Sequence, residues 1–250
     1  MDFFISIVVG FGFFTTVPVP FIEWEGKYFR YIPIVLPMIG LFVGGLGYLL
    51  MMLFGMLDTS PILYSIFIII YFVVITGGLH LDAVMDTADA FFSRRDIDRK
   101  LEIMKDSRVG AFAVVSAIIF FLLKFGLIHE MLIREKSLLY FIIIPMLSRS
   151  FQALMLYNCK YATDEGIAKL YKGVIKKWDQ LYIILFNTVV LGFALSLNLK
   201  VLPLVIASLL FAIYYKRFSV KQFRGITGDI IGAFLELTEV ILIAIVVFVL

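Results

Sequence analysis

Long apolar runs separated by short charged clusters dominate this chain. Most of the runs approach the roughly 20 residues that a helix needs to cross a bilayer. Eight of them are candidate spans, at 3–20, 33–57, 61–79, 109–128, 137–157, 180–197, 201–215 and 230–250. The seventh run is short and the first ends in Thr-Thr-Val-Pro-Val-Pro, so seven spans is the second interpretation. The pattern predicts an all-α, polytopic transmembrane helical bundle of about eight spans.

The basic residues favour one orientation. Of the 22 Lys and Arg residues, six lie within 82–108, five within 160–177, four within 216–224 and two within 27–30. The connection at Asp58 carries none. Because loops rich in Lys and Arg stay in the cytoplasm, we expect these four alternate connections on the cytoplasmic side. With eight spans, both termini then face outward.

Composition narrows the class further. Hydrophobic residues make up 62% of the chain and charged residues 16%, against about a quarter charged in soluble domains. The lipid bilayer is therefore an expected partner, and a water-soluble fold is excluded. No linker rich in Pro, Ser or Gly divides the sequence, so residues 1–250 form a single integral membrane domain. The single cysteine, Cys159, leaves no internal disulfide and no cysteine metal cluster.

An acidic segment, GGLHLDAVMDTAD, directly follows the third run. Its aspartates Asp82, Asp86 and Asp89 are spaced i, i+4, i+7, which places them within about 60° of one another on a helix. Three carboxylates at a membrane face repel one another and cost desolvation, and no basic residue stands three or four positions away. Oxygen ligands of this kind suit Mg²⁺, so the segment predicts a metal site. His80 fits a supporting hydrogen-bond donor, a general base or a simple interfacial residue.

A second charged cluster follows at 94–108. Carboxylates beside Arg and Lys are the composition that phosphoryl transfer requires, but a solvated helix with i, i+4 ion pairs explains much of the same pattern. The cluster contains Asp98, Glu102 and Asp106, interleaved with Arg94, Arg95, Arg99, Lys100, Lys105 and Arg108.

Glycines and a lone arginine add two further expectations. Gly77, Gly78 and Gly110 would let backbone approach a ligand, whereas Gly40, Gly44 and Gly47 in the second run indicate close helix packing. Arg149, inside the fifth run, needs an anionic partner, either a substrate phosphate or a carboxylate on another helix. The last run supplies candidate carboxylates at Asp229, Glu236 and Glu239.

At this point the motifs resemble a known family. GGLHLDAVMDTADAFF, RKLEIMKDSRVGAF and the later RGITGDIIGAFLELTE are similar to the cobalamin synthases, the adenosylcobinamide-GDP ribazoletransferases. FFTTVPVP, YIPIVLPMIGLFVGGL and LSRSFQALMLYNCKYATDEGIAK extend the resemblance over nearly the whole chain. The sequence departs from the family pattern at Ala83 and Ala90, where glycine is common, and at Thr16, where arginine often stands.

The resemblance implies a Mg²⁺-dependent transfer of α-ribazole, or its 5′-phosphate, onto adenosylcobinamide-GDP with release of GMP. It places the enzyme in the prokaryotic cytoplasmic membrane with the active site facing the cytoplasm. No nucleic-acid partner is implied, and an oligomer is compatible with the sequence. By this resemblance the metal ligands are Asp82, Asp86, Asp89 and Asp106. The catalytic residues are His80, Asp82 and Asp86. The residues that bind substrate phosphates are Arg94, Lys105, Arg108 and Arg149, and Asp229 completes the site.

Three alternatives remain open on the residues alone. A CDP-alcohol phosphotransferase would carry a DGxxAR pattern, but Ala-Val-Met-Asp follows Asp82 here. A prenyltransferase of the aromatic-acceptor type would carry two similar aspartate-rich loops, and only one cluster here has close aspartates. A cation transporter often shows inverted repeats, which the sequence lacks, and the six basic residues beside the acids would oppose cation passage.

Overall fold

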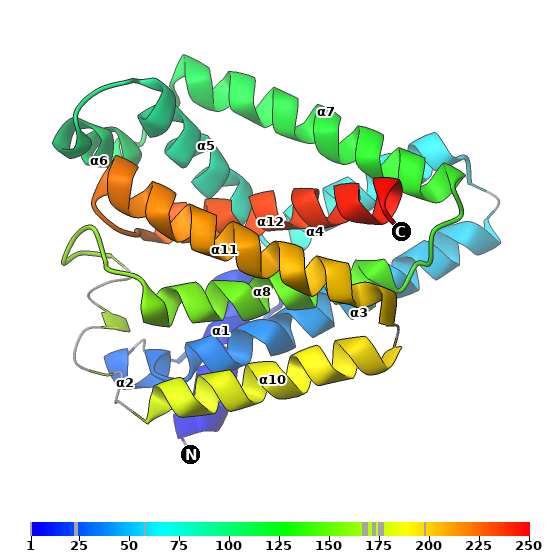
Figure 1. Ribbon diagram of the computed structural model, residues 1–250, viewed down its shortest axis with the longest axis horizontal. Helices are drawn as coiled ribbons and strands as arrows, with labels where there is room; N and C mark the ends of the chain where they lie inside the picture. The colour runs from blue at the N-terminus through cyan, green and yellow to red at the C-terminus, as the bar shows by residue number, and fades with distance from the viewer. Residues whose placement is uncertain are drawn as a thin grey trace.

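A computed structural model describes residues 2–22, 25–57, 59–166, 170–171, 174, 178–197 and 199–250. The predicted connection at Asp58 and the basic residues Lys169, Lys172, Lys176 and Lys177 lie outside the described residues. The helices are α1 (Asp2–Phe14), α2 (Gly26–Phe29), α3 (Ile32–Met56), α4 (Pro61–Ile75), α5 (Leu79–Phe92), α6 (Ile97–Lys105), α7 (Ala111–Ile133), α8 (Tyr140–Asn158), α10 (Asp179–Leu197), α11 (Leu202–Phe223) and α12 (Gly228–Phe248). The prediction of an all-α helical bundle is confirmed (Figure 1).

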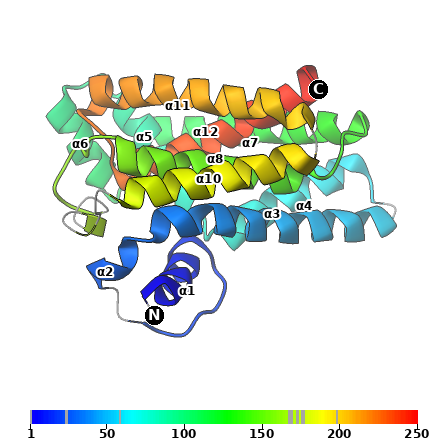
Figure 2. The ribbon, with the colours of Figure 1, turned by 60° about the horizontal axis from the view of Figure 1, so that its bottom comes forward.

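The number of spans differs from the first prediction. Among the described residues, six helices are long and apolar enough to cross a membrane, and α4 with α5 forms a seventh candidate that is bent by 89°. The prediction of eight spans is therefore wrong, and seven, the second interpretation, agrees with the structure. The missing span is α1, which has 13 residues and lies across α3 outside the layer of long helices (Figure 2). Seven crossings would put the two ends of the chain on opposite sides of the membrane and six would put them on the same side, so the outward orientation of both termini stays a prediction.

The connections that carry the basic residues lie together at one end of the bundle, on the left in Figure 1. The turn between α5 and α7 containing α6, the chain after α8, the turn from α11 to α12 and the segment before α3 all meet there. The alternate-loop pattern in the sequence thus corresponds to one face of the structure. Which side of the membrane this face occupies stays a prediction.

Close packing of α3 against α8 forms the middle of the bundle. A Cβ atom on Gly40 would overlap the backbone at Pro145, and one on Gly44 would overlap the backbone at Phe141. Gly47 lies against the ring of Tyr71. The prediction that these small residues serve helix packing is confirmed. The apolar faces of α7, α10 and α11 remain largely exposed, as expected for helices that meet lipid.

A sharp break separates α4 from α5. Gly77 and Gly78 have φ values of 62° and 73°, a left-handed conformation that glycine adopts without strain. The chain after α1 stabilises the break, because the Thr16 backbone N–H donates to the Ile75 carbonyl at 2.9 Å and its hydroxyl to the Val74 carbonyl at 3.1 Å. The two glycines therefore turn the chain and start α5 inside the bundle.

Candidate functional site

The acidic face of α5 is held in place by a close contact with α12. Gly232 of α12 leaves so little room that a Cβ atom there would lie 2.5 Å from the Cβ of Ala83. In this arrangement Asp86 is close enough to interact electrostatically with Asp82 and Asp89 on its own helix and with Asp229 at the start of α12. The structure thus brings four acidic side chains from two helices into one region.

These four carboxylates have no ion-pair partner among the described residues, although basic side chains are abundant at the same end. The Asp89 carboxylate lies directly against Gly110 at the start of α7, where a Cβ atom would overlap it. An accumulation of unpaired carboxylates needs a counter-charge, and their hard oxygen atoms are the donors that Mg²⁺ prefers. As placed, no group of three acidic, histidine or cysteine side chains in the described part of the chain is close enough to enclose a metal ion.

Asp106, predicted as a fourth metal ligand, is engaged elsewhere. It ends α6 and accepts a hydrogen bond from the Arg108 guanidinium at 2.7 Å. This hydrogen bond lowers the pKa of Asp106 to about 2, so the carboxylate stays charged and paired with Arg108. Asp229 lies beside the acidic face of α5, whereas the assignment of Asp106 as a metal ligand stays a prediction.

The rest of the 94–108 cluster is largely solvated surface. Arg99 pairs with Glu102 at 2.7 Å on the exposed side of α6, and Asp98 pairs with Arg224 at 2.9 Å. Arg94 is exposed in the turn before α6 with a φ of 54°. The interpretation of this segment as a helix surface with ion pairs is supported for these residues, although the spacing within the helix is i, i+3.

A cavity of about 400 Å³ lies at the end of the bundle that carries the basic connections. Three of the predicted site residues line it together: His80, Lys105 and Asp229. Lys105 donates to Glu165, which also lines the cavity, at 2.5 Å. The cavity draws on five helices and one loop, namely α1, α5, α6, α8, α12 and the segment 163–166.

Backbone hydrogen bonds tie the 160–166 segment to the start of α12. The Ile226 N–H donates to the Lys160 carbonyl at 2.8 Å, and the Ala162 N–H donates to the Ile226 carbonyl at 2.9 Å. Thr227 then caps α12 by accepting from the Ile230 N–H at 3.2 Å. The TGD sequence therefore orients Asp229. The two backbone hydrogen bonds of Ile226 also fix the 160–166 segment, which forms one wall of the cavity.

His80 is an interior residue. Its side chain is 2% exposed, and its ring lies nearly parallel to that of Phe14 at 6.1 Å between centroids. Its Nε2 atom has no hydrogen-bond partner in the part of the chain that the structure describes. The structure thus places His80 inside the protein at the wall of the cavity, and its role stays a prediction.

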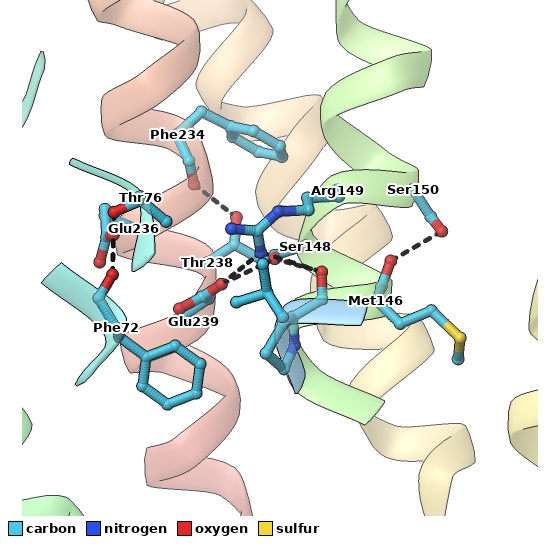
Figure 3. A network of polar contacts seen from close by, with 12 residues as sticks. Phe72, Thr76, Met146, Ser148, Arg149, Ser150, Phe234, Glu236, Thr238 and Glu239 are labelled. Atoms are coloured by element: carbon cyan, nitrogen blue, oxygen red, sulfur yellow. Dashed lines mark hydrogen bonds and ion pairs between the residues drawn. The ribbon is translucent and has the colours of Figure 1, made fainter. Parts of the chain in front are cut away.

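Arg149 belongs to a buried ion network that is separate from the cavity. Figure 3 shows Arg149 of α8 and Glu239 of α12 pointing towards one another, at 3.1 Å, with the Ser148 hydroxyl on the same carboxylate. Lys124 of α7 adds contacts to Glu236 at 2.8 Å and to Glu239 at 3.6 Å. The geometry favours the interhelical pair over the phosphate contact assigned to Arg149.

The sequence interpretation missed two residues. Lys124 is a single lysine in the apolar stretch FFLLKFG, and Gln152 is a single amide one turn after Arg149. Both are buried, at 4% and 2% exposure. A polar side chain inside a membrane helix is costly unless it has a partner. The sequence therefore contained a signal that each of these residues has a structural or functional role.

The fold and the site define a polytopic helical membrane protein with an acidic face on α5, unpaired among the described residues, beside a cavity whose largely apolar walls carry a few polar groups. The family model for cobalamin-5-phosphate synthase matches residues 6–247. The chain therefore belongs to the cobalamin-5-phosphate synthase family.

Relatives named adenosylcobinamide-GDP ribazoletransferase are similar over most of their length. The protein from Clostridium perfringens is 31% identical over 240 residues, which cover 95% of each chain. That from Geobacillus sp. is 33% identical over 233 residues, covering 91% of this chain and 89% of the relative. That from Clostridioides difficile is 31% identical over 238 residues, covering 92% and 91%. No solved structure matches the chain.

Proposed function

We propose that this protein transfers α-ribazole, or its 5′-phosphate, onto adenosylcobinamide-GDP and releases GMP. The observation that carries the proposal is the group of unpaired carboxylates on α5 and α12 beside a cavity, in a chain whose relatives bear that activity in their names. A ribose hydroxyl oxygen bonds to the phosphorus atom next to cobinamide, and the bond to the bridging oxygen breaks. GMP leaves with that oxygen, and a base takes up the hydroxyl proton.

Asp82, Asp86, Asp89 and Asp229 would hold Mg²⁺, and the ion supplies positive charge where the leaving phosphate becomes more negative. The same carboxylates are candidates to accept the hydroxyl proton, because Asp229 lines the cavity and interacts with Asp82 and Asp86. A base must stand within hydrogen-bond reach of the proton that it removes. Asp229 is the candidate base among them, since it belongs to both the cavity and the acidic region.

Basic residues at the same end would attract and bind the phosphate groups of the substrates. Lys105 lines the cavity and is paired with Glu165, a contact that a substrate phosphate would replace. Arg94 and Arg108 are exposed near the acidic face, where they would raise the local concentration of anionic substrates. Because loops rich in basic residues stay in the cytoplasm, we propose that this end faces the cytoplasm.

The family match disfavours the alternatives. A CDP-alcohol phosphotransferase, a prenyltransferase or a cation transporter would not be expected to match the cobalamin-5-phosphate synthase model over residues 6–247. The ion network of Lys124, Arg149, Glu236 and Glu239 is also balanced in charge, which leaves no unpaired acid in that network for a transported cation.

The test is reconstitution. Purified protein in detergent or nanodiscs receives adenosylcobinamide-GDP, α-ribazole and Mg²⁺, and GMP and the corrinoid product are measured by liquid chromatography. We expect both products in equal amounts, and neither after the metal is removed with a chelator. Absence of both products from folded protein, in an assay validated with one of the relatives, would exclude the proposed activity.

A further inference from the structure

Two deeply buried polar residues line the cavity, and each has a side-chain atom without a hydrogen-bond partner in the described part of the chain. His80 Nε2 and Gln152 Oε1 have no hydrogen-bond partner among the described residues, each side chain is 2% exposed, and both residues line the cavity. Leaving a buried polar group unpaired costs about 1–3 kcal/mol, and nearly all such groups in proteins are satisfied. These two side chains therefore indicate a ligand that enters the cavity and bonds to them.

The walls indicate the chemistry of that ligand. Around the two polar groups the cavity is lined by aromatic and aliphatic side chains, among them Phe14, Leu101 and Met104. Such walls accept the faces of a flat, largely apolar ring, while a few convergent polar groups fix its orientation. A heterocycle with hydrogen-bonding atoms at its edge meets both requirements.

Size separates the two substrates of the proposed reaction. A volume of about 400 Å³ is at the lower end of the range of about 300–1,000 Å³ for small-molecule sites. It is sufficient for a nucleoside, but a corrin ring with its side-chain amides and a GDP group is far larger. We infer that this cavity is the binding subsite for α-ribazole, with Gln152 and His80 as its hydrogen-bonding residues; the inference rests on the proposed function.

The position of the cavity agrees with the chemistry. Asp229 lines it and interacts electrostatically with Asp82 and Asp86, so the ribose of a bound α-ribazole lies next to the acidic face. Lys105 lines the same cavity and fits the 5′-phosphate of the phosphorylated substrate. The corrinoid then approaches the acidic face from outside the cavity, where Asp82 is exposed.

The variant Gln152→Met tests the subsite, because it removes the amide at nearly constant volume. In nanodiscs we expect the Kd of α-ribazole, measured calorimetrically without corrinoid, and its KM to rise about 5- to 10-fold, the loss of one hydrogen bond. The KM of adenosylcobinamide-GDP should not change. The matched control is Ser150→Ala, also on α8, because Ser150 bonds to the Met146 carbonyl of its own helix and does not line the cavity; both KM values should stay unchanged.

A second measurement does not depend on how well Gln152→Met folds. Thr163 lines the cavity, and the only native cysteine, Cys159, is buried. Alkylation of a Thr163→Cys variant should be slowed by α-ribazole and not by adenosylcobinamide-GDP, with the wild type as background. Protection by the corrinoid alone, or a rise only in the corrinoid KM of Gln152→Met, would assign the cavity to the other substrate and overturn the inference. An unchanged Kd and KM for α-ribazole in folded Gln152→Met would also overturn it.

The same measurements separate the subsite from the proposed function. Binding of α-ribazole that depends on Gln152 without any GMP release would refute the proposed function and leave the subsite standing.

Discussion

Lys124 of α7 donates a hydrogen bond to Glu236 of α12 at 2.8 Å, and both side chains are almost fully enclosed, with 5% and 11% exposure. Glu239, nearly one turn later on α12, accepts from Arg149 and also contacts Lys124. Two cations thus balance two carboxylates and join α7, α8 and α12. The carboxylates on the acidic face of α5 have no ion-pair partner among the described residues. We therefore interpret the paired charges as structural and the unpaired carboxylates as the candidate site.

Removing Lys124 should destabilise the protein. Lys124→Met leaves two buried carboxylates with one cation, and breaking a buried pair from one side costs about 3–5 kcal/mol. We expect a marked fall in the thermal midpoint of the detergent-solubilised protein, followed by tryptophan fluorescence. The double variant Lys124→Met/Glu236→Gln removes both charges and should recover most of the loss. An unchanged midpoint in the single variant would contradict the network.

The α3–α8 contact offers a matched pair of glycines. Gly44→Ala places a Cβ atom 2.6 Å from the Phe141 carbonyl oxygen, whereas a Cβ atom on Gly45 meets nothing within 4 Å. Overpacking typically costs about 1–3 kcal/mol, so Gly44→Ala should lower the thermal midpoint. Gly45→Ala should leave it unchanged or slightly raised, since alanine favours a helix. Equal effects of the two substitutions would show that α3 and α8 are not packed as described.

The acidic face should be essential for turnover. Asp82→Asn and Asp86→Asn keep the size of the side chain and remove its charge, and we expect each to reduce GMP release about a hundredfold or more. Asp98→Asn is the control, because Asp98 lies exposed on α6, where it pairs with Arg224. The activity of this variant should stay within about twofold of the wild type. Near-normal turnover in folded Asp86→Asn would remove the acidic face from the mechanism.

Gly110 gives a subtler test of the same face. Gly110→Ala would push a methyl group into the Asp89 carboxylate and displace a proposed metal ligand without deleting it. The Mg²⁺ concentration for half-maximal activity should therefore rise, by roughly tenfold, the lower effect expected from disturbing a metal site. Gly126→Ala on the same helix meets no atom within 4 Å and should leave the Mg²⁺ dependence unaltered. An identical Mg²⁺ curve for both variants would argue against Asp89 as a ligand.

Sequence patterns predicted the bundle, its basic end and its glycine packing, because each depends on local spacing and composition. The span count failed at α1, whose 13 residues are too few for a span and lie against α3. Thr16 binds the end of α4 and stabilises a right-angle turn at Gly77 and Gly78, and these glycines were interpreted as ligand-approach positions. The expected span at 61–79 already ended at these glycines, but the bond between Thr16 and Val74 joins segments 58 residues apart and has no local signal in the sequence.

The candidate site was predictable in part. The i, i+4, i+7 spacing placed Asp82, Asp86 and Asp89 on one face, but the position of Asp229 beside them depends on which segments meet in space, and only the family resemblance indicated it. Asp106 is paired with Arg108 two residues later, while Asp229 reaches α5 across the α5–α12 contact. Lys124 was overlooked because one lysine hardly changes the mean hydropathy of a long apolar run.

The break between α4 and α5 also has a consequence for biosynthesis. A helix with three aspartates is a poor substrate for insertion by a translocon, since one aspartate at mid-membrane already costs about 2.5–3.5 kcal/mol. The groups that accommodate α5, with Gly232 and Asp229 in α12, are synthesised some 140 residues later. We therefore expect α4 to enter the bilayer before α5 packs into the bundle. Because α5 can pack against Gly232 only after α12 has been synthesised, we expect the acidic face to reach its position long after α5 itself has been made.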